Sequence, residues 1–182
     1  RRAKSYPYEI PARSYVVHED RHEELAICVP MPDVSGRKPV LAVGSNQSPR
    51  QLIRKFKEEN LGAIPVIRAR LKDFDIVYSP HISSYGAIPA TLRHSPGTVA
   101  ALFVTWLTPA QEERMHETEV APGNYLFGEL EDIELRLDMG LMLTSAFVYS
   151  SRHGSLARDG LPVSLAEPES CGTQTILVFL IF

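Results

Sequence analysis

Apolar residues occupy both faces of the segment 99–107. One face carries Val99, Ala101, Phe103 and Thr105, and the other carries Ala100, Leu102, Val104 and Trp106. A strand that is apolar on both faces is typical of the interior of a sheet. The pattern therefore predicts that this segment is a central strand.

Shorter apolar runs predict further strands before and after this segment. They cover residues 14–17, 25–29, 39–43, 64–69, 74–79, 87–93, 125–130, 133–137 and 144–149. Polar residues, glycines and prolines separate these runs. Residues 18–24 and 85–86 are predicted to be turns, Ser95-Pro96-Gly97 a tight turn between strands, and Arg158-Asp159-Gly160 a hairpin turn.

Two short helices are predicted from their N-terminal signals. Ser48 followed by Pro49 favours a helix start, and the apolar residues after it share one face up to about residue 59. The sequence 108–111, Thr-Pro-Ala-Gln, is that of a capping box and predicts a helix over 109–117. Together these elements predict an α+β fold in which a small mixed β-barrel is flanked by short helices.

Changes in composition divide the chain into three parts. Residues 1–38 form a polar, proline-punctuated arm with short strands, 39–150 the barrel domain, and 151–182 a C-terminal hairpin and tail. The tail ends in the uncharged apolar run 176–182. Such a run is an aggregation hazard unless it pairs as a strand.

Composition and charge exclude several functions. A formal net charge of −3 over 182 residues gives no support for nucleic-acid binding. The longest apolar run, 176–182, is far shorter than the ~20 residues of a membrane-spanning helix. Cys28 and Cys171 have no metal-ligand spacing and the sequence shows no secretory signal, so a reduced cytoplasmic setting is expected.

The sequence Gly44-Ser45-Asn46 is the first candidate site. It joins the apolar run 39–43 to the helix start at Ser48, so backbone N–H groups and two polar side chains can converge on one point. Such a turn can hold an anionic or carbonyl group of a small molecule. The same residue types also make ordinary strand-to-helix turns.

Glu119 is the second candidate, because a carboxylate beside such a pocket can act as acid and base. The alternative is a solvated surface carboxylate. His116 and Glu119 lack a third metal ligand, so no metal is predicted. No nucleophile elbow, Walker loop or dinucleotide fingerprint is present, and no cofactor is predicted.

Taken in order, these segments resemble the γ-glutamylcyclotransferase (AIG2-like) family. Val43-Gly44-Ser45-Asn46 is similar to its Tyr-Gly-Ser-Asn loop, and residues 115–119 (Met-His-Glu-Thr-Glu) to its Leu-Asp-x-x-Glu. Further matching segments are 69–74, 86–92, 95–97, 99–107 and 123–125. The resemblance covers residues 40–130, about half of the chain.

The resemblance implies a small mixed β-barrel flanked by helices that cleaves a γ-glutamyl amide to 5-oxoproline and a free amine. The α-amine of the substrate attacks its own γ-carbonyl, so neither a protein nucleophile nor a metal is needed. Glu119 matches the acid/base position. Gly44, Ser45 and Asn46, with Val43, match the binding loop, and Tyr125 would line the pocket.

This chain departs from the family pattern at four positions. Val43 replaces the loop tyrosine, Met115 and His116 replace the Leu-Asp pair, and Val120 replaces the glycine after the glutamate. Two alternatives therefore stay open: a non-catalytic small-molecule-binding module on the same fold, and a protein-interaction module that uses the terminal extensions.

Overall fold

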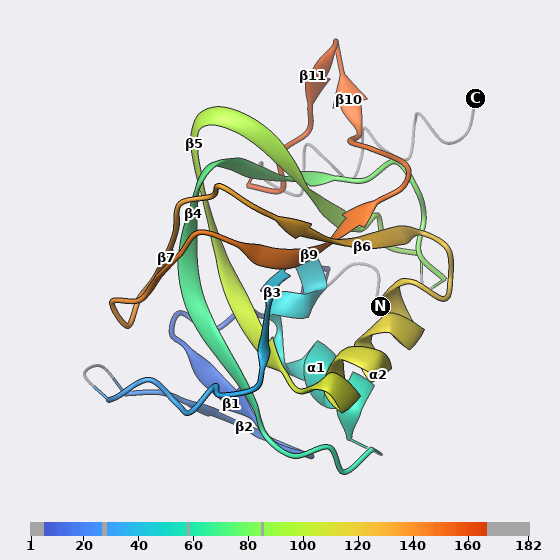
Figure 1. Ribbon diagram of the computed structural model, residues 1–182. Helices are drawn as coiled ribbons and strands as arrows, with labels where there is room; N and C mark the ends of the chain where they lie inside the picture. Colours follow the sequence, from blue (N-terminus) through green and yellow to red (C-terminus); the bar gives the residue numbers. More distant parts are fainter. Residues whose placement is uncertain (1–5, 27–28, 58, 85, 167–182) are drawn as a thin grey trace.

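A nine-stranded mixed sheet forms the body of the molecule (Figure 1). The computed structural model describes residues 6–26, 29–57, 59–84 and 86–166. The strands are β1 (Tyr15–Val17), β2 (His22–Glu24), β3 (Lys38–Ala42), β4 (Ile64–Tyr78), β5 (Ala90–Leu107), β6 (Tyr125–Leu130), β7 (Leu135–Leu137), β8 (Met142–Leu143) and β9 (Ala146–Ser151). Their order is β2-β1-β4-β5-β3-β9-β6, with β7 paired to β4 and β8 to β7.

The segment 99–107 lies in the interior of this sheet, as predicted. It is the second half of β5, which pairs with β4 on one side and β3 on the other. Apolar side chains from its two faces enter two separate cores. Leu102 and Val104 pack in one core and Phe103 and Leu107 in the other.

Two short helices cover the core that contains Phe103. They are α1 (Pro49–Phe56) and α2 (Pro109–Glu119), and they pack against each other beside β3 and the end of β5 (Figure 1). The capping box of α2 is confirmed: Thr108 and Gln111 each accept a hydrogen bond from the other's backbone N–H. These helices and the mixed sheet confirm the predicted α+β fold class.

The tight turn predicted at Ser95-Pro96-Gly97 is wrong as a boundary between strands. These residues lie inside the continuous strand β5 and form a bulge opposite Asp73. The backbone N–H of Gly97 donates to Asp73 Oδ1 at 2.7 Å, and both residues have positive φ values, +82° and +63°. The chain does not reverse at these residues, so the predicted strands 87–93 and 99–107 merge into β5. The predicted strands 64–69 and 74–79 likewise merge into β4.

Other element boundaries also differ from the prediction. The second strand of the arm is β2, at His22–Glu24, instead of residues 25–29, because the chain reverses where the N–H of His18 donates to the carbonyl of Arg21. The helix α1 ends at Phe56, and α2 continues to Glu119. The strands predicted at 133–137 and 144–149 are β7 and β9, each displaced by two residues at one end or both.

The terminal parts also contribute to this body. In the arm, β1 pairs with β4. After β9, the strands β10 (Ala157–Arg158) and β11 (Leu161–Pro162) form the predicted hairpin, with Asp159 and Gly160 at positive φ. Cys28, Cys171 and the run 176–182 lie outside the described residues, and the three-part division of the chain stays a prediction.

Within the described ranges, neither helix is long and apolar enough to cross a membrane.

Candidate active site

A cavity of about 310 Å³ opens where the end of β3, both helices and the loop before β5 meet. Its wall includes Tyr6, Val43, Ser45, Asn46, Lys55, His81, Glu119, Tyr125 and Tyr149. Five of these residues, Val43, Ser45, Asn46, Glu119 and Tyr125, are the ones singled out in the sequence. The cavity thus joins the predicted loop to the predicted carboxylate.

Gly44 lies behind the cavity wall, where it sets the shape of the loop. Residues Gly44–Gln47 form a turn of 3-10 helix, η2, between β3 and α1. Gly44 has a φ of +59°, and a Cβ on it would overlap the hydroxyl oxygen of Tyr6 and lie 2.9 Å from the Cβ of Ala90. Both its conformation and its surroundings therefore require glycine.

Part of the backbone of this turn is engaged internally. The N–H of Asn46 donates to the carbonyl of Val43 at 3.4 Å, and the N–H of Ser48 donates to the carbonyl of Ser45 at 3.0 Å. These two donors hold the turn together. An anion at this loop would therefore be held by the remaining groups, including the Ser45 hydroxyl.

Glu119, the last residue of α2, contacts two side chains from other elements. Its Oε1 accepts a hydrogen bond from Asn46 Nδ2 at 3.1 Å and forms an ion pair with Lys55 Nζ. Lys55 Nζ also donates to Asn46 Oδ1 at 2.8 Å. Each of the three side chains is therefore bound to the other two.

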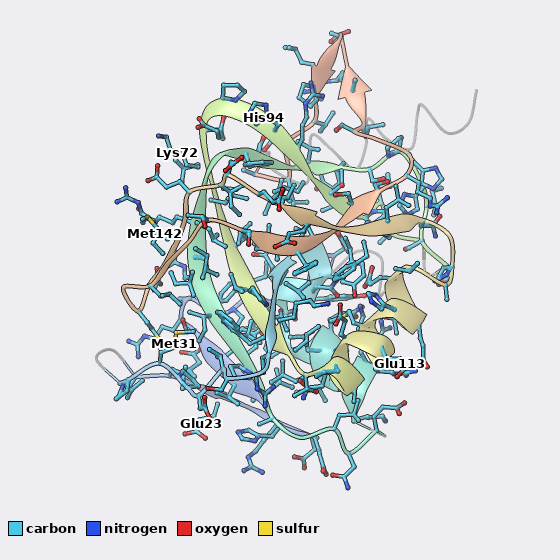
Figure 2. All side chains as sticks on the ribbon, viewed as in Figure 1. Glu23, Met31, Lys72, His94, Glu113 and Met142 are labelled. Atoms are coloured by element: carbon cyan, nitrogen blue, oxygen red, sulfur yellow. The ribbon has the colours of Figure 1, made fainter. Side chains whose placement is uncertain are left out.

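The two helices place this ion pair in a largely buried position. Lys55 lies on α1 between the buried residues Leu52 and Phe56, and its side chain is 5% exposed. Met115, one turn before Glu119 on α2, directs its sulfur to 3.4 Å from Lys55 Nζ. Glu113 on the same helix projects away from the body of the molecule (Figure 2).

Aromatic and imidazole rings form the opposite side of the cavity. The hydroxyl of Tyr125 donates to the carbonyl of Ala90 at 3.2 Å, and the His81 ring lies 5.8 Å from the Tyr125 ring. Burial lowers the pKa of His81, and the neighbouring His153, whose ring is 4.7 Å away, lowers it further. At neutral pH His81 therefore presents an uncharged imidazole to the cavity.

Tyr149 is also held in its uncharged form by burial, and here the neighbouring charges are negative. Burial raises the pKa of its phenol far above the usual range, and the negative charges of Glu119 and Glu112 raise it further. Its hydroxyl lies 2.9 Å from His116 Nδ1. His116, which replaces the family's aspartate, therefore lies beside the cavity wall, about one helical turn before Glu119.

Several residues of this site were missed in the sequence, among them Lys55, Tyr6, His81 and Tyr149. Lys55 carried a signal, because a lysine beside Leu52 and Phe56 on the apolar stripe of a helix is unusual and indicates a buried partner. Tyr6 carried none. It comes from the arm, and its hydroxyl accepts a hydrogen bond from the N–H of Ala90 at 2.6 Å, a contact across 84 positions of the chain.

Among the described residues, no three His, Cys, Asp or Glu side chains are grouped so that they could hold a metal ion.

Comparison with known proteins identifies the fold. No protein-family model matches the chain, and no curated protein matches it. A solved γ-glutamyl cyclotransferase superposes with a TM-score of 0.52 at 18% identity, over 64% of this chain and 68% of that one. The solution structure of At5g39720.1 from Arabidopsis thaliana superposes with a TM-score of 0.52 at 12% identity, over 82% of this chain and 91% of that one.

A second Arabidopsis thaliana protein, At3g28950.1, superposes with a TM-score of 0.50 at 12% identity, over 84% of this chain and 82% of that one. Identities this low establish a shared fold and leave the activity open. The chain has the γ-glutamylcyclotransferase-like α+β fold, in agreement with the resemblance of its sequence motifs.

Proposed function

We propose that this protein is a cyclotransferase-type enzyme that cleaves a γ-glutamyl amide, or a related small amide, to 5-oxoproline and a free amine. One observation carries the proposal: a single cavity joins the loop at Gly44-Ser45-Asn46 to Glu119, and Asn46 is hydrogen-bonded to that carboxylate. The superposition on a γ-glutamyl cyclotransferase supports the same assignment at the level of fold.

The reaction needs few protein groups. The α-amine of the substrate attacks its γ-carbonyl, a new C–N bond closes the five-membered ring, and the original amide C–N bond breaks. The α-amine must lose protons and the leaving nitrogen must gain them. Glu119 takes a proton from the attacking amine and delivers it to the leaving amine, while the cavity supplies orientation.

The cavity has the size and polarity for such a substrate. Its volume of about 310 Å³ is at the lower end of the range for small-molecule sites. In the proposed complex, Ser45 and the free N–H groups of its loop bind the α-carboxylate or the developing oxyanion, and Val43 and Tyr125 flank the carbon chain. A cytoplasmic location is part of this proposal and is based on the cysteine content of the sequence.

The test is to incubate the protein with a panel of γ-glutamyl amino acids and γ-glutamyl amines and to measure 5-oxoproline. We expect turnover of at least one member and a loss of at least about a hundredfold in Glu119→Gln. Glu113→Gln is the matched control, since Glu113 is an exposed carboxylate on the same helix. Absence of turnover across the panel, or full turnover by Glu119→Gln, would refute the proposal.

A second candidate is a non-catalytic binding module on the same fold. Two observations favour it: Val43 gives the cavity methyl groups where the related loop has a hydroxyl, and Glu119 Oε1 is already engaged by Lys55 and Asn46. This candidate predicts that γ-glutamyl compounds raise the melting temperature without yielding 5-oxoproline.

A further inference from the structure

We infer that Lys55 is a positioning residue of this site, which orients Glu119 so that its Oε2 faces the reacting amine and stabilises the negative charge of that carboxylate between turnovers. The inference rests on the proposed function. It concerns a lysine that lies outside the loop and the carboxylate motif, on the helix between them.

The contacts of Lys55 leave its ammonium group no freedom. An ammonium has three N–H donors and no acceptor. Lys55 Nζ has three acceptors in reach, which are Glu119 Oε1, Asn46 Oδ1 at 2.8 Å and Met115 Sδ at 3.4 Å. With its side chain 5% exposed, Lys55 is held at a fixed point between the loop and α2.

Lys55 also fixes the orientation of the Asn46 amide. Because an ammonium only donates, the amide oxygen must face Lys55, and Nδ2 must then face Glu119, to which it donates at 3.1 Å. The side chain of Asn46 is therefore committed to Glu119. Because its backbone N–H donates to the carbonyl of Val43, its part in binding substrate is left to the second N–H of Nδ2.

The two donors converge on one oxygen of Glu119. Asn46 and Lys55 both bind Oε1, whereas Oε2 has no hydrogen bond to any of the described residues. Oε2 is therefore the oxygen that can exchange a proton with substrate. A carboxylate held at one oxygen by two fixed donors presents the other in a defined direction, which acid/base catalysis requires.

Stability alone does not account for this pair. Replacing a buried ion pair by apolar residues of similar volume is often neutral or stabilising, so the pair is weak evidence for a structural role. Glu119 is 14% exposed and lines the cavity, so one end of the pair meets the solvent and any ligand. The arrangement thus indicates a role in the chemistry of Glu119.

The experiment compares Lys55→Met, which has a similar length and no charge, with Lys55→Arg, which retains the charge. We expect Lys55→Met to lower kcat by at least about tenfold with KM within about threefold, and to move the acid limb of the kcat/KM profile to higher pH, because the carboxylate loses the positive charge beside it. Lys55→Arg should keep the wild-type limb. Lys72→Met, which removes an exposed lysine paired with Glu134, is the matched control.

Other titratable or charged groups surround the pair. They are Arg54 on α1, Glu112, Arg114 and His116 on α2, Tyr149 on β9, and Tyr6, His81 and Tyr125 in the cavity wall. All of them are unchanged between the variants, so a difference between Lys55→Met and Lys55→Arg reports Lys55. An unchanged kcat and acid limb in Lys55→Met, or a loss confined to KM, would overturn the inference.

Two further measurements keep the test decisive. Carbon-13 NMR of the Glu119 carboxylate at a single neutral pH needs no substrate, and its resonance should change in Lys55→Met and stay at the wild-type position in Lys72→Met. A changed resonance without turnover by wild type would refute the proposed function alone, whereas turnover with an unchanged resonance would refute the inference alone. If Lys55→Met does not fold, the double variant with Glu119→Gln should fold; failure of the double variant would show that Lys55 serves packing and would overturn the inference.

Discussion

Two lysine–glutamate ion pairs of the molecule differ in their exposure to water. One is largely buried at the cavity, here called the cavity end, and the other is exposed beside the bulge of β5, here called the outer end. Lys55 and Glu119 have side chains 5% and 14% exposed. Lys72 and Glu134 are 56% and 34% exposed and lie 3.3 Å apart. Figure 2 shows Lys72 at the edge of the molecule, away from Glu113 on α2. The two pairs consist of the same residue types and differ in their surroundings.

The same two regions each contain a glycine with positive φ. Gly44 has a φ of +59° and is enclosed by Tyr6 and Ala90. Gly97, in the bulge beside Lys72, has a φ of +82° and nothing within 4 Å of the place where a Cβ would be. Both positions have a left-handed backbone conformation, which favours glycine, and they differ in how closely neighbouring side chains approach.

This difference shows which features of the site are constrained. An exposed ion pair gains little Coulomb energy in water and loses side-chain entropy, so it contributes little to stability. A buried pair removes both charges from water, so each charge depends on the other. The cavity end is therefore the region where single substitutions should have large effects, and the outer end provides controls of the same chemical type.

The largest expected effect is on folding stability after Lys55→Met. Removing the ammonium leaves the Glu119 carboxylate largely buried and without its cation, which costs about 3–5 kcal/mol. Lys72→Met should leave the free energy of unfolding unchanged within error. Urea denaturation of both variants measures the difference, and equal losses would show that burial does not distinguish the two pairs.

Next in size is the effect of Gly44→Ala. A left-handed conformation costs an L-residue about 1–2 kcal/mol, and the overlap of the new Cβ with the Tyr6 hydroxyl adds to this cost. Gly97→Ala carries the backbone cost alone, because its Cβ would enter open space. Thermal unfolding of both variants should therefore rank Gly44→Ala as the less stable one.

The combination with Tyr6→Phe sharpens this prediction. Tyr6→Phe takes away the acceptor of the Ala90 N–H and should therefore destabilise wild type. It should cost less stability in the Gly44→Ala background, where it also removes the overlapping atom, and the same as in wild type in the Gly97→Ala background. An equal cost in all three backgrounds would mean that the Tyr6 ring moves aside without cost.

Much of the fold follows from local sequence. The apolar faces of 99–107, the capping box at Thr108 and the hairpin turn at Asp159-Gly160 are each determined by residues close together in the chain. The bulge in β5 is not, because Ser95-Pro96-Gly97 has the composition of a chain-reversing turn. The pairing of β5 with β4 on both sides of the bulge, together with the hydrogen bond from Gly97 to Asp73, 24 positions away, depends on residues distant in sequence.

Some residues of the candidate site could likewise be identified from local sequence, and others depend on how distant segments pack. The loop at Gly44-Ser45-Asn46 and Glu119 were found because each belongs to a motif with a recognisable order. Tyr6 could not be found, because its place beside Ala90 depends on how the arm packs on the sheet. For Lys55 the sequence shows the anomaly of a lysine on an apolar stripe, and only the packing of α1 against α2 identifies its partner.

The smallest expected effect concerns pH and the two histidines His81 and His94. Burial and the nearby His153 lower the pKa of His81 below 6.5 in the folded protein. Between that lowered value and 6.5, the unfolded chain binds more protons than the folded one, so stability rises with pH there. The contribution is complete above about pH 6.5 and is lost as the pH falls toward the folded value.

We therefore expect the melting temperature of wild type to fall between pH 7.5 and 5.5, and to fall less in His81→Gln, which has no group to titrate. His153→Gln should reduce the slope by a smaller amount, since it removes the secondary cause and leaves the burial of His81. The control is His94→Gln, in which an exposed ring at the outer end is replaced (Figure 2). If His81→Gln kept the full wild-type slope, the pH dependence would arise outside the cavity, and the contrast between the two ends would not extend to their histidines.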